Sequence, residues 1–102
     1  MKDYKLRFLS LFEDDLNRIV DYICFQLENP KAAYALADDV DKAIAKRLPY
    51  AESFEVYPTK KERGSHYYRI YVRNYTIFYV VIGEVMEVRR ILYGRRDCEN
   101  QL

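Results

Sequence analysis

The sequence predicts an α+β fold, in which a short amino-terminal strand and a long antiparallel helical hairpin pack on a mainly antiparallel β-sheet meander. Apolar residues recur with the helical period of about 3.6 residues as far as Leu48, and with the strand period of 2 after Ser53. The later connections are two residues long, which is typical of antiparallel neighbours. Half of the 102 residues are hydrophobic, so we expect one domain, residues 1–102, with a buried core.

The amino-terminal segment predicts a strand followed at once by a helix. Polar and apolar residues alternate over Tyr4–Leu9, as in a half-buried strand. Ser10 to Glu13 reads as a capping box, in which the Ser10 side chain accepts a hydrogen bond from the Glu13 amide. Asp14 and Asp15 complement the helix dipole, and the sequence indicates no other role for them. The residues expected on the buried face are Leu16, Ile19, Val20, Ile23 and Leu27.

Asn29 and Pro30 separate this helix from a second one. The residue before a proline is driven out of the α conformation, whereas proline suits the first turn of a helix capped by asparagine. The second helix is expected to end at about Leu48, because Pro49 follows it. Its apolar stripe consists of Ala33, Leu36, Ala37, Val40, Ile44 and Leu48. The two helices therefore form a hairpin.

Four strands are expected after the hairpin, which gives the order βααββββ. Arg73-Asn74 and Gly83-Glu84 supply the two tight turns, and Gly94 ends the last strand. The segment from Pro58 to Ser65 is polar and basic and is expected to be a loop. The strands are Ser53–Tyr57, Tyr67–Val72, Tyr75–Ile82 and Val85–Tyr93.

Composition excludes several classes of protein. No apolar run reaches the roughly 18 residues of a membrane span, and the amino terminus lacks the features of a signal peptide. Two cysteines, Cys24 and Cys98, one histidine and no CxxC pair give neither a disulfide framework nor a metal-ligand pattern. We therefore expect a cytoplasmic protein with reduced thiols, no metal, no small-molecule cofactor and no membrane partner.

Basic residues are concentrated in the carboxyl-terminal part of the chain. Residues 1–59 hold eight Lys and Arg against eleven Asp and Glu, whereas residues 60–102 hold nine against five. The run VRRILYGRRD, residues 88–97, contains four arginines. Such a basic concentration suits a phosphate backbone or an acidic partner. Strand arginines also commonly pair with helix carboxylates, which is the structural alternative for Arg89 and Arg90.

The order of these features resembles a known family. The segment YYRIYVRNYTIFYVVIGEVMEVRRILYGRRD follows helical segments that begin FEDDLNRIVDYI and LENPKAAYAL. Arg73 before the tight turn, the tyrosine strand from Tyr75 to Tyr79 and the closing run from Leu92 to Asp97 resemble the RelE/ParE family over nearly the whole chain. That family forms the toxin half of type II toxin–antitoxin modules. The resemblance implies the predicted fold and a cognate antitoxin protein as partner.

One branch of the family cleaves messenger RNA on the ribosome. This chemistry needs cations around the phosphate, a base for the 2′-hydroxyl and an acid for the leaving oxygen, but no metal. If the chain is such a nuclease, the resemblance implies Arg73 and Arg96 as catalytic cations. The usual tail Tyr or His is missing, and Glu99 could substitute for it as base, although the family pattern does not assign this role. Tyr75, Tyr93 and His66 are further candidates for proton transfer. The RNA-binding cations would be Lys60, Lys61, Arg63, Arg73, Arg95 and Arg96.

The other branch poisons DNA gyrase, and we expect this chain to belong there. Relatives of this kind have a long helical hairpin, a basic end to the last strand and no nuclease residues. Target contacts would come from Arg89, Arg90, Arg95 and Arg96. A third possibility is an inactive module that binds only its antitoxin. In each case we expect an acidic, partly disordered antitoxin segment that covers the face with Arg73 and Arg96 or the groove beside the hairpin.

Overall fold

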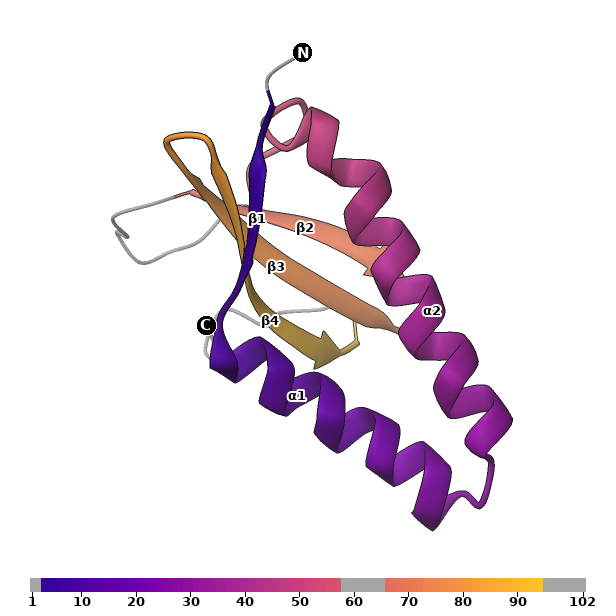
Figure 1. The fold of residues 1–102 in the computed structure, drawn as a ribbon. Coiled ribbons are helices and arrows are strands. Elements are labelled where there is room, and N and C mark those ends of the chain that lie inside the picture. The colour runs from indigo at the N-terminus through magenta and orange to yellow at the C-terminus, as the bar shows by residue number, and fades with distance from the viewer. Residues whose placement is uncertain (1–2, 58–65, 95–102) are drawn as a thin grey trace.

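A computed structural model describes residues 3–57 and 66–94 of the chain. Two helices cover one face of a four-stranded sheet (Figure 1). The strand order is β1-β4-β3-β2, with β1 parallel to β4 and the other neighbours antiparallel. The predicted α+β fold with a mainly antiparallel sheet is therefore confirmed. The elements are β1 (Lys5–Phe8), α1 (Ser10–Asp21), α2 (Pro30–Arg47), β2 (Tyr67–Val72), β3 (Tyr75–Ile82) and β4 (Val85–Tyr93).

The main core lies between the helices and the sheet. Leu36, Val40 and Ile44 recur at helical spacing along the buried face of α2, as the sequence predicts. A smaller apolar cluster lies on the opposite face of the sheet, where Tyr57 packs against it. The sheet contributes Tyr68, Ile70, Val72, Ile77, Tyr79, Met86, Val88 and Ile91 to the main core, and Tyr67, Phe78, Val80 and Leu92 to the smaller cluster.

The strands β2, β3 and β4 have the bounds that the sequence predicts. Both tight turns between these strands contain a residue with positive φ. Gly83 has a φ of 62° in the turn between β3 and β4, a conformation that glycine adopts without steric cost. Arg73 has a φ of 53° in the turn between β2 and β3, which is uncommon for a residue with a Cβ.

The prediction of a strand at Ser53–Tyr57 is wrong. Within that segment the Tyr57 amide donates to the Tyr67 carbonyl at 2.6 Å, and the Ser53 amide closes a turn onto the Tyr50 carbonyl at 3.0 Å. Farther along β2, the Arg69 carbonyl accepts instead from the Arg47 side chain at 3.1 Å. A ladder does not continue here because a guanidinium from α2 occupies the edge of the sheet.

The predicted capping box at Ser10 is also wrong. The cap residue is Leu9, whose carbonyl accepts from the amides of Phe12 and Glu13 at 3.0 and 3.2 Å, with no side-chain cap. The Leu9 amide donates to the Val88 carbonyl of β4 at 2.9 Å. This last bond of the β1 ladder fixes Leu9 at the junction, so the helix begins one residue earlier than the capping pattern implies.

The helical hairpin turns as predicted, and Leu16, Ile19 and Ile23 of the predicted stripe pack against the main core. The Asn29 side chain caps α2 by accepting from the Ala32 amide at 3.2 Å, and Pro30 follows it. Between α1 and this cap, Tyr22–Gln26 forms a widened π-helical turn. The extra residue in such a turn rotates the side chains after it about the helix axis, and Leu27, expected in the core, is 56% exposed.

Asp15 has a structural role that the sequence did not indicate. Its side chain is only 3% exposed on α1. The carboxylate accepts from Arg90 Nε at 2.7 Å, from Arg90 Nη2 at 3.0 Å and from the Ile91 amide at 3.2 Å. Two charge-assisted bonds and one backbone bond therefore join the first helix to the last strand.

A β-bulge lies in β4 next to the arginine that binds Asp15. Phe78 pairs with Arg90 and Tyr79 pairs with Val88, so Arg89 is the extra residue of β4. A bulge changes which face the following residues point to. Val88 and Ile91 consequently both reach the main core, and the adjacent Arg89 and Arg90 bind partners on different elements.

We predict that Asp15→Ala lowers the free energy of unfolding by about 3 kcal/mol, because it leaves the Arg90 guanidinium and the Ile91 amide without their acceptor in a largely buried place. Asp14→Ala is the matched control, since Asp14 is exposed on the same turn and its loss should change stability by about 0.5 kcal/mol or less. Urea unfolding followed by circular dichroism measures both. Equal losses for the two variants would contradict this role.

Candidate functional site

The structure describes three of the arginines that the sequence singles out. Arg73 lies in the turn between β2 and β3, and Arg89 and Arg90 lie at the bulge of β4. The other sequence-predicted site residues lie outside the described residues, and their roles stay predictions. They are Lys60, Lys61, Arg63, Arg95, Arg96 and Glu99.

Arg73 is bound to the second helix. Its Nε donates to Asp39 Oδ2 at 2.8 Å, and its Nη2 lies 2.7 Å from the same oxygen. Both side chains remain about half exposed, so the pair is worth little stability on its own. The contact does hold the turn, with its positive φ at Arg73, against α2. A ligand phosphate would have to compete with Asp39 for this guanidinium.

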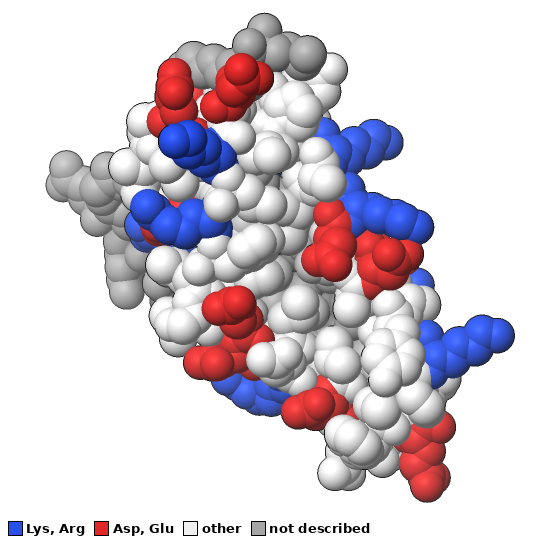
Figure 2. Space-filling view, viewed as in Figure 1, with Lys and Arg blue, Asp and Glu red and all other residues white. Residues whose placement is uncertain are grey.

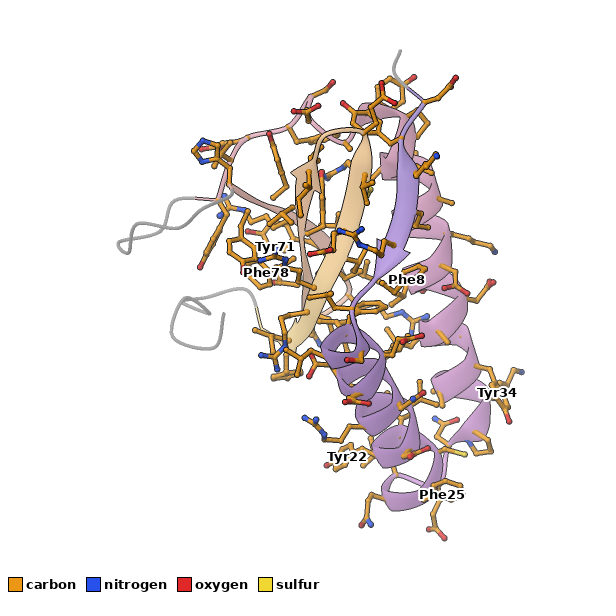
Figure 3. All side chains as sticks on the ribbon, turned by 60° about the vertical axis from the view of Figure 1, so that its left-hand side comes forward. Phe8, Tyr22, Phe25, Tyr34, Tyr71 and Phe78 are labelled. Atoms are coloured by element: carbon orange, nitrogen blue, oxygen red, sulfur yellow. The ribbon has the colours of Figure 1, made fainter. Side chains whose placement is uncertain are left out.

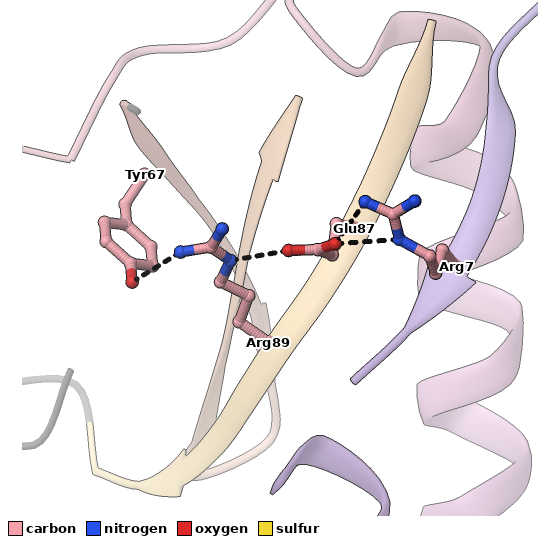
Figure 4. A network of polar contacts seen from close by, with 4 residues as sticks. All are labelled: Arg7, Tyr67, Glu87 and Arg89. Carbon is pink, nitrogen blue, oxygen red and sulfur yellow. Dashed lines mark hydrogen bonds and ion pairs between the residues drawn. The ribbon is translucent and has the colours of Figure 1, made fainter. Parts of the chain in front are cut away.

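Arg89 belongs to a network on the sheet face opposite the helices (Figure 4). Its Nε donates to Glu87 Oε1 at 2.8 Å, and its Nη1 donates to the Tyr67 hydroxyl at 3.3 Å. Arg7 of β1 donates to the other oxygen of Glu87, with its Nε at 2.8 Å. Burial raises the pKa of the Glu87 carboxyl, but the hydrogen bonds from Arg7 and Arg89 outweigh it and lower the pKa below the usual 4.5. A carboxylate between two guanidiniums thus joins β1, β4 and β2.

Arg90 forms part of the wall of a groove between the hairpin and the end of the sheet. The groove has a volume of about 840 Å³ and an apolar lining contributed by α1, the π-helical turn, α2 and the last residues of β4. The lining includes the buried Asp15, which is bonded to Arg90, and the exposed Arg18, which lies 3.9 Å from Asp15. The apolar side chains of the lining are Ile19, Tyr22, Ile23, Leu27, Ala32, Tyr75, Ile91, Leu92 and Tyr93.

Exposed aromatic residues lie near the tip of the hairpin, and one of them also lines this groove. Tyr22, Phe25 and Tyr34 project from the end of the two helices (Figure 3). Phe25 and Tyr34 are each 70% exposed, and Tyr22 also lines the groove. Exposed apolar side chains next to an apolar groove indicate a surface for a macromolecular partner. These aromatic residues are visible in the sequence as candidates for a binding surface, but the helical pattern alone does not show that they lie outside the core.

The face formed by the helices and β1 carries charges of both signs. Acidic and basic side chains are interspersed around uncharged surface (Figure 2). On α2, Lys42 pairs with Asp38 at 2.8 Å, four residues apart. A surface of mixed charge does not provide the single-sign field that attracts a phosphate backbone.

Two of the candidate proton-transfer residues that the structure describes, Tyr75 and Tyr93, line the groove together with Arg90. His66 is exposed immediately before β2. Tyr75 and Tyr93 contact each other edge to face, with ring centroids 5.5 Å apart. Burial, and then the neighbouring Tyr93 and Tyr22, raise the pKa of Tyr75, so its hydroxyl is a poor base at neutral pH.

Two further properties concern metals and membranes. In residues 3–57 and 66–94, no group of three His, Cys, Asp or Glu side chains is arranged to hold a metal ion. None of the helices in that part of the chain is both long and apolar enough to cross a membrane. Cys24 is a free cysteine, whereas Cys98 lies outside the described residues.

Solved structures of toxin–antitoxin systems contain chains that are similar to this one. One is described as the chromosomal ParDE TA system from P. aeruginosa, with a TM-score of 0.74 and 17% identity over 91% of this chain and 98% of that chain. Another is the RelB-RelE antitoxin–toxin complex from Methanococcus jannaschii, with a TM-score of 0.47 and 22% identity over 85% of this chain and 88% of that chain. No curated protein sequence matches the chain significantly.

The sequence itself identifies the family. The family described as the ParE toxin of the type II toxin–antitoxin system parDE matches residues 6–98. The chain belongs to this family, which confirms the resemblance to RelE/ParE toxins. The match includes the helical hairpin, the groove and the sheet.

We predict that the stability supplied by Glu87 is lost in acid. Because the folded pKa is lowered, this stability is fully present above the unfolded value near pH 4.5 and disappears as pH falls through the folded pKa. Wild-type protein should therefore exceed Glu87→Gln in unfolding free energy at about pH 7, and the difference should shrink toward about pH 3. Urea unfolding at a series of pH values tests this, with the exposed Glu84→Gln as control. A gap between wild type and Glu87→Gln that is independent of pH would contradict the network.

Proposed function

We propose that this chain is the toxin of a type II module that arrests growth by poisoning DNA gyrase. The observation that carries the proposal is the match to the ParE toxin family over residues 6–98, since ParE-like toxins act on gyrase. The activity would need no covalent chemistry on the toxin and no cofactor. It would need a surface that binds the topoisomerase or the DNA that it holds.

The partners of the described arginines support this proposal over the ribosomal nuclease. A metal-independent ribonuclease needs several cations directed at one phosphate. Arg73 binds Asp39 of α2, Arg89 binds Glu87 of β4, and Arg90 binds Asp15 of α1. Within the described part of the chain, these three guanidiniums thus bind three separate carboxylates and are not directed at one common point.

The remaining basic residues are the candidates for target contacts. Arg95 and Arg96 follow Gly94 directly in the sequence, and Lys60, Lys61 and Arg63 precede β2. We propose that Arg95 and Arg96 contact gyrase or its DNA. Glu99 has a role only in a nuclease, as the base.

We further propose that the cognate antitoxin binds the groove with an acidic, partly disordered segment that folds there. The groove has apolar walls for the buried face of such a segment, and its lining includes the exposed Arg18 for a carboxylate. Exposed Phe25 and Tyr34 would add apolar contact area at the hairpin tip.

The target prediction is that purified toxin inhibits supercoiling by gyrase and increases gyrase-linked DNA breaks. In cells, induction of the toxin should produce such breaks while messenger RNA on translating ribosomes remains intact. Gel assays of plasmid topology and primer extension on abundant transcripts measure the two effects. Toxin mixed with its antitoxin is the control.

Three outcomes separate the alternatives. Transcripts cut at A-site codons, with gyrase unaffected, would show that the chain is a ribosome-dependent nuclease. Absence of both effects, with antitoxin binding retained, would show an inactive module. Gyrase breaks with intact transcripts would support the proposal.

The groove prediction concerns antitoxin affinity. The double variant Tyr22→Ala/Leu27→Ala should bind the antitoxin encoded beside the gene at least about tenfold more weakly, because two exposed apolar side chains of the groove are truncated. Tyr50→Ala is the matched control, since Tyr50 is also about half exposed but lies outside the groove lining. Isothermal titration calorimetry measures the affinities. Equal affinities for the wild type and the double variant would place the antitoxin elsewhere.

A further inference from the structure

The strand β1 forms an edge of the sheet. It pairs with β4 on one side, and among the described strands none lies on its other side. Figure 1 shows β1 at the outside of the sheet, beside the helices. An edge strand presents unpaired backbone groups to which a further strand can bond.

Hydrogen bonds to β4 determine which backbone groups of β1 face outward. The Lys5 amide donates to the Glu84 carbonyl at 2.7 Å, and the Leu9 amide donates to the Val88 carbonyl at 2.9 Å. Backbone groups of successive residues in a strand point to opposite sides, so alternate residues serve the same neighbour. The amides and carbonyls of Leu6 and Phe8 therefore point away from β4, toward the open side.

The opposite edge of the sheet, at β2, is closed by the protein itself. The Tyr57 amide donates to the Tyr67 carbonyl at 2.6 Å, and Arg47 Nη1 donates to the Arg69 carbonyl at 3.1 Å. Arg47 also donates to the Tyr79 hydroxyl at 3.0 Å and stacks on Phe54. Such covering is a usual protection of edge strands. The β1 edge has no comparable cover among the described residues.

The side chains of β1 define what kind of strand could bind beside it. Leu6 and Phe8, 38% and 40% exposed, are on the side of the helices, where Phe8 stacks on Phe12. A shallow hollow of about 220 Å³ lies next to Phe8. Lys5 and Arg7 are exposed on the other side, where Arg7 reaches Glu87. A partner strand would complement this pattern if its apolar residues lay beside Leu6 and Phe8 and its acidic residues lay beside Lys5 and Arg7.

We infer that the open edge of β1 binds an extended, acidic segment of a partner polypeptide, which adds a fifth strand to the sheet. The backbone groups of Leu6 and Phe8 would supply the hydrogen bonds, and the alternation of Lys5 and Arg7 with apolar residues would supply the selectivity. This site is separate from the groove of the proposed function and does not depend on gyrase as target.

A second copy of this chain does not fit the edge. If β1 strands of two copies paired antiparallel with their apolar residues on the same face, the cations of one copy would lie opposite those of the other. Depending on the register, Lys5 of one copy would lie opposite Arg7 of the other, or each residue would lie opposite the same residue of the other copy. Like charges directly opposite each other are destabilising. The same charges that prevent self-pairing favour an acidic partner.

A tethered strand tests the inference on the full chain. A five-residue segment of alternating Glu and Val is fused to the amino terminus through a short flexible Gly-Ser linker, which raises its effective concentration to about the millimolar range. Amide hydrogen exchange is followed by NMR. The amides of Leu6 and Phe8 should exchange about tenfold more slowly or better, whereas those of Lys5 and Arg7, already in the ladder to β4, serve as internal references.

Two matched variants complete the test. A fusion with Lys in place of Glu has the same length and strand propensity but the wrong charge, and it should give little protection. Leu6→Pro in the Glu fusion removes an outward amide without removing a bond to β4, and it should abolish the protection at Phe8. Absence of protection with the Glu strand, or equal protection with the Lys strand, would overturn the inference. The Lys fusion leaves the chain itself unchanged, so its outcome does not depend on whether Leu6→Pro folds.

Discussion

The buried carboxylate of Asp15 is the contact on which the arrangement of helices and sheet depends. It accepts two bonds from Arg90 and one from the Ile91 amide, so it fixes α1 to β4 beside the bulge. The cost of burying this carboxylate is offset only while all these donors remain in place. The same contact is part of the groove lining, which means that the proposed binding surface and the stability of the fold share one interaction.

The bulge at Arg89 explains how Val88 and Ile91, three residues apart in β4, both reach the main core. Without the extra residue, Arg90 and Val88 would share one face, and Ile91 would point away from the core. Arg89 joins Glu87 and Tyr67 on the open face of the sheet, while Arg90 reaches the helix. The first pair of arginines in VRRILYGRRD thus contributes to structure, and we propose that the second pair, Arg95 and Arg96, acts on the target.

Sequence patterns predicted the regular parts of this fold because local and tertiary preferences agree there. Alternation in β2 to β4 and the turn residue Gly83 leave one register, and Asn29-Pro30 marks the start of α2. The wrong predictions occur where a residue distant in the sequence determines the local structure. The ladder bond of Leu9 displaced the cap from Ser10, and Arg47 occupies the edge where a strand at Ser53–Tyr57 would have paired.

The candidate site was less predictable for the same reason. The sequence pointed to Arg73, Arg89 and Arg90 as cations, but it could not show their carboxylate partners, which lie 34, 2 and 75 residues away. Asp15 reads as an ordinary acidic residue in the first turn of a helix, and its contact with Arg90 joins residues 75 positions apart. The groove depends equally on tertiary structure, because its lining combines the hairpin with the end of β4.

The most direct test compares Arg90→Ala with Arg96→Ala for both unfolding free energy and inhibition of gyrase, at concentrations of folded protein that are matched. We expect Arg90→Ala to lose about 3 kcal/mol of stability, since it leaves Asp15 buried without its counter-ion, but to inhibit gyrase as the wild type does. Arg96→Ala should keep its stability and lose about ten- to a hundredfold in potency, as expected for a lost charge-assisted contact. A stable Arg90→Ala variant, or an Arg96→Ala variant of full potency, would contradict the division of roles between the two arginine pairs.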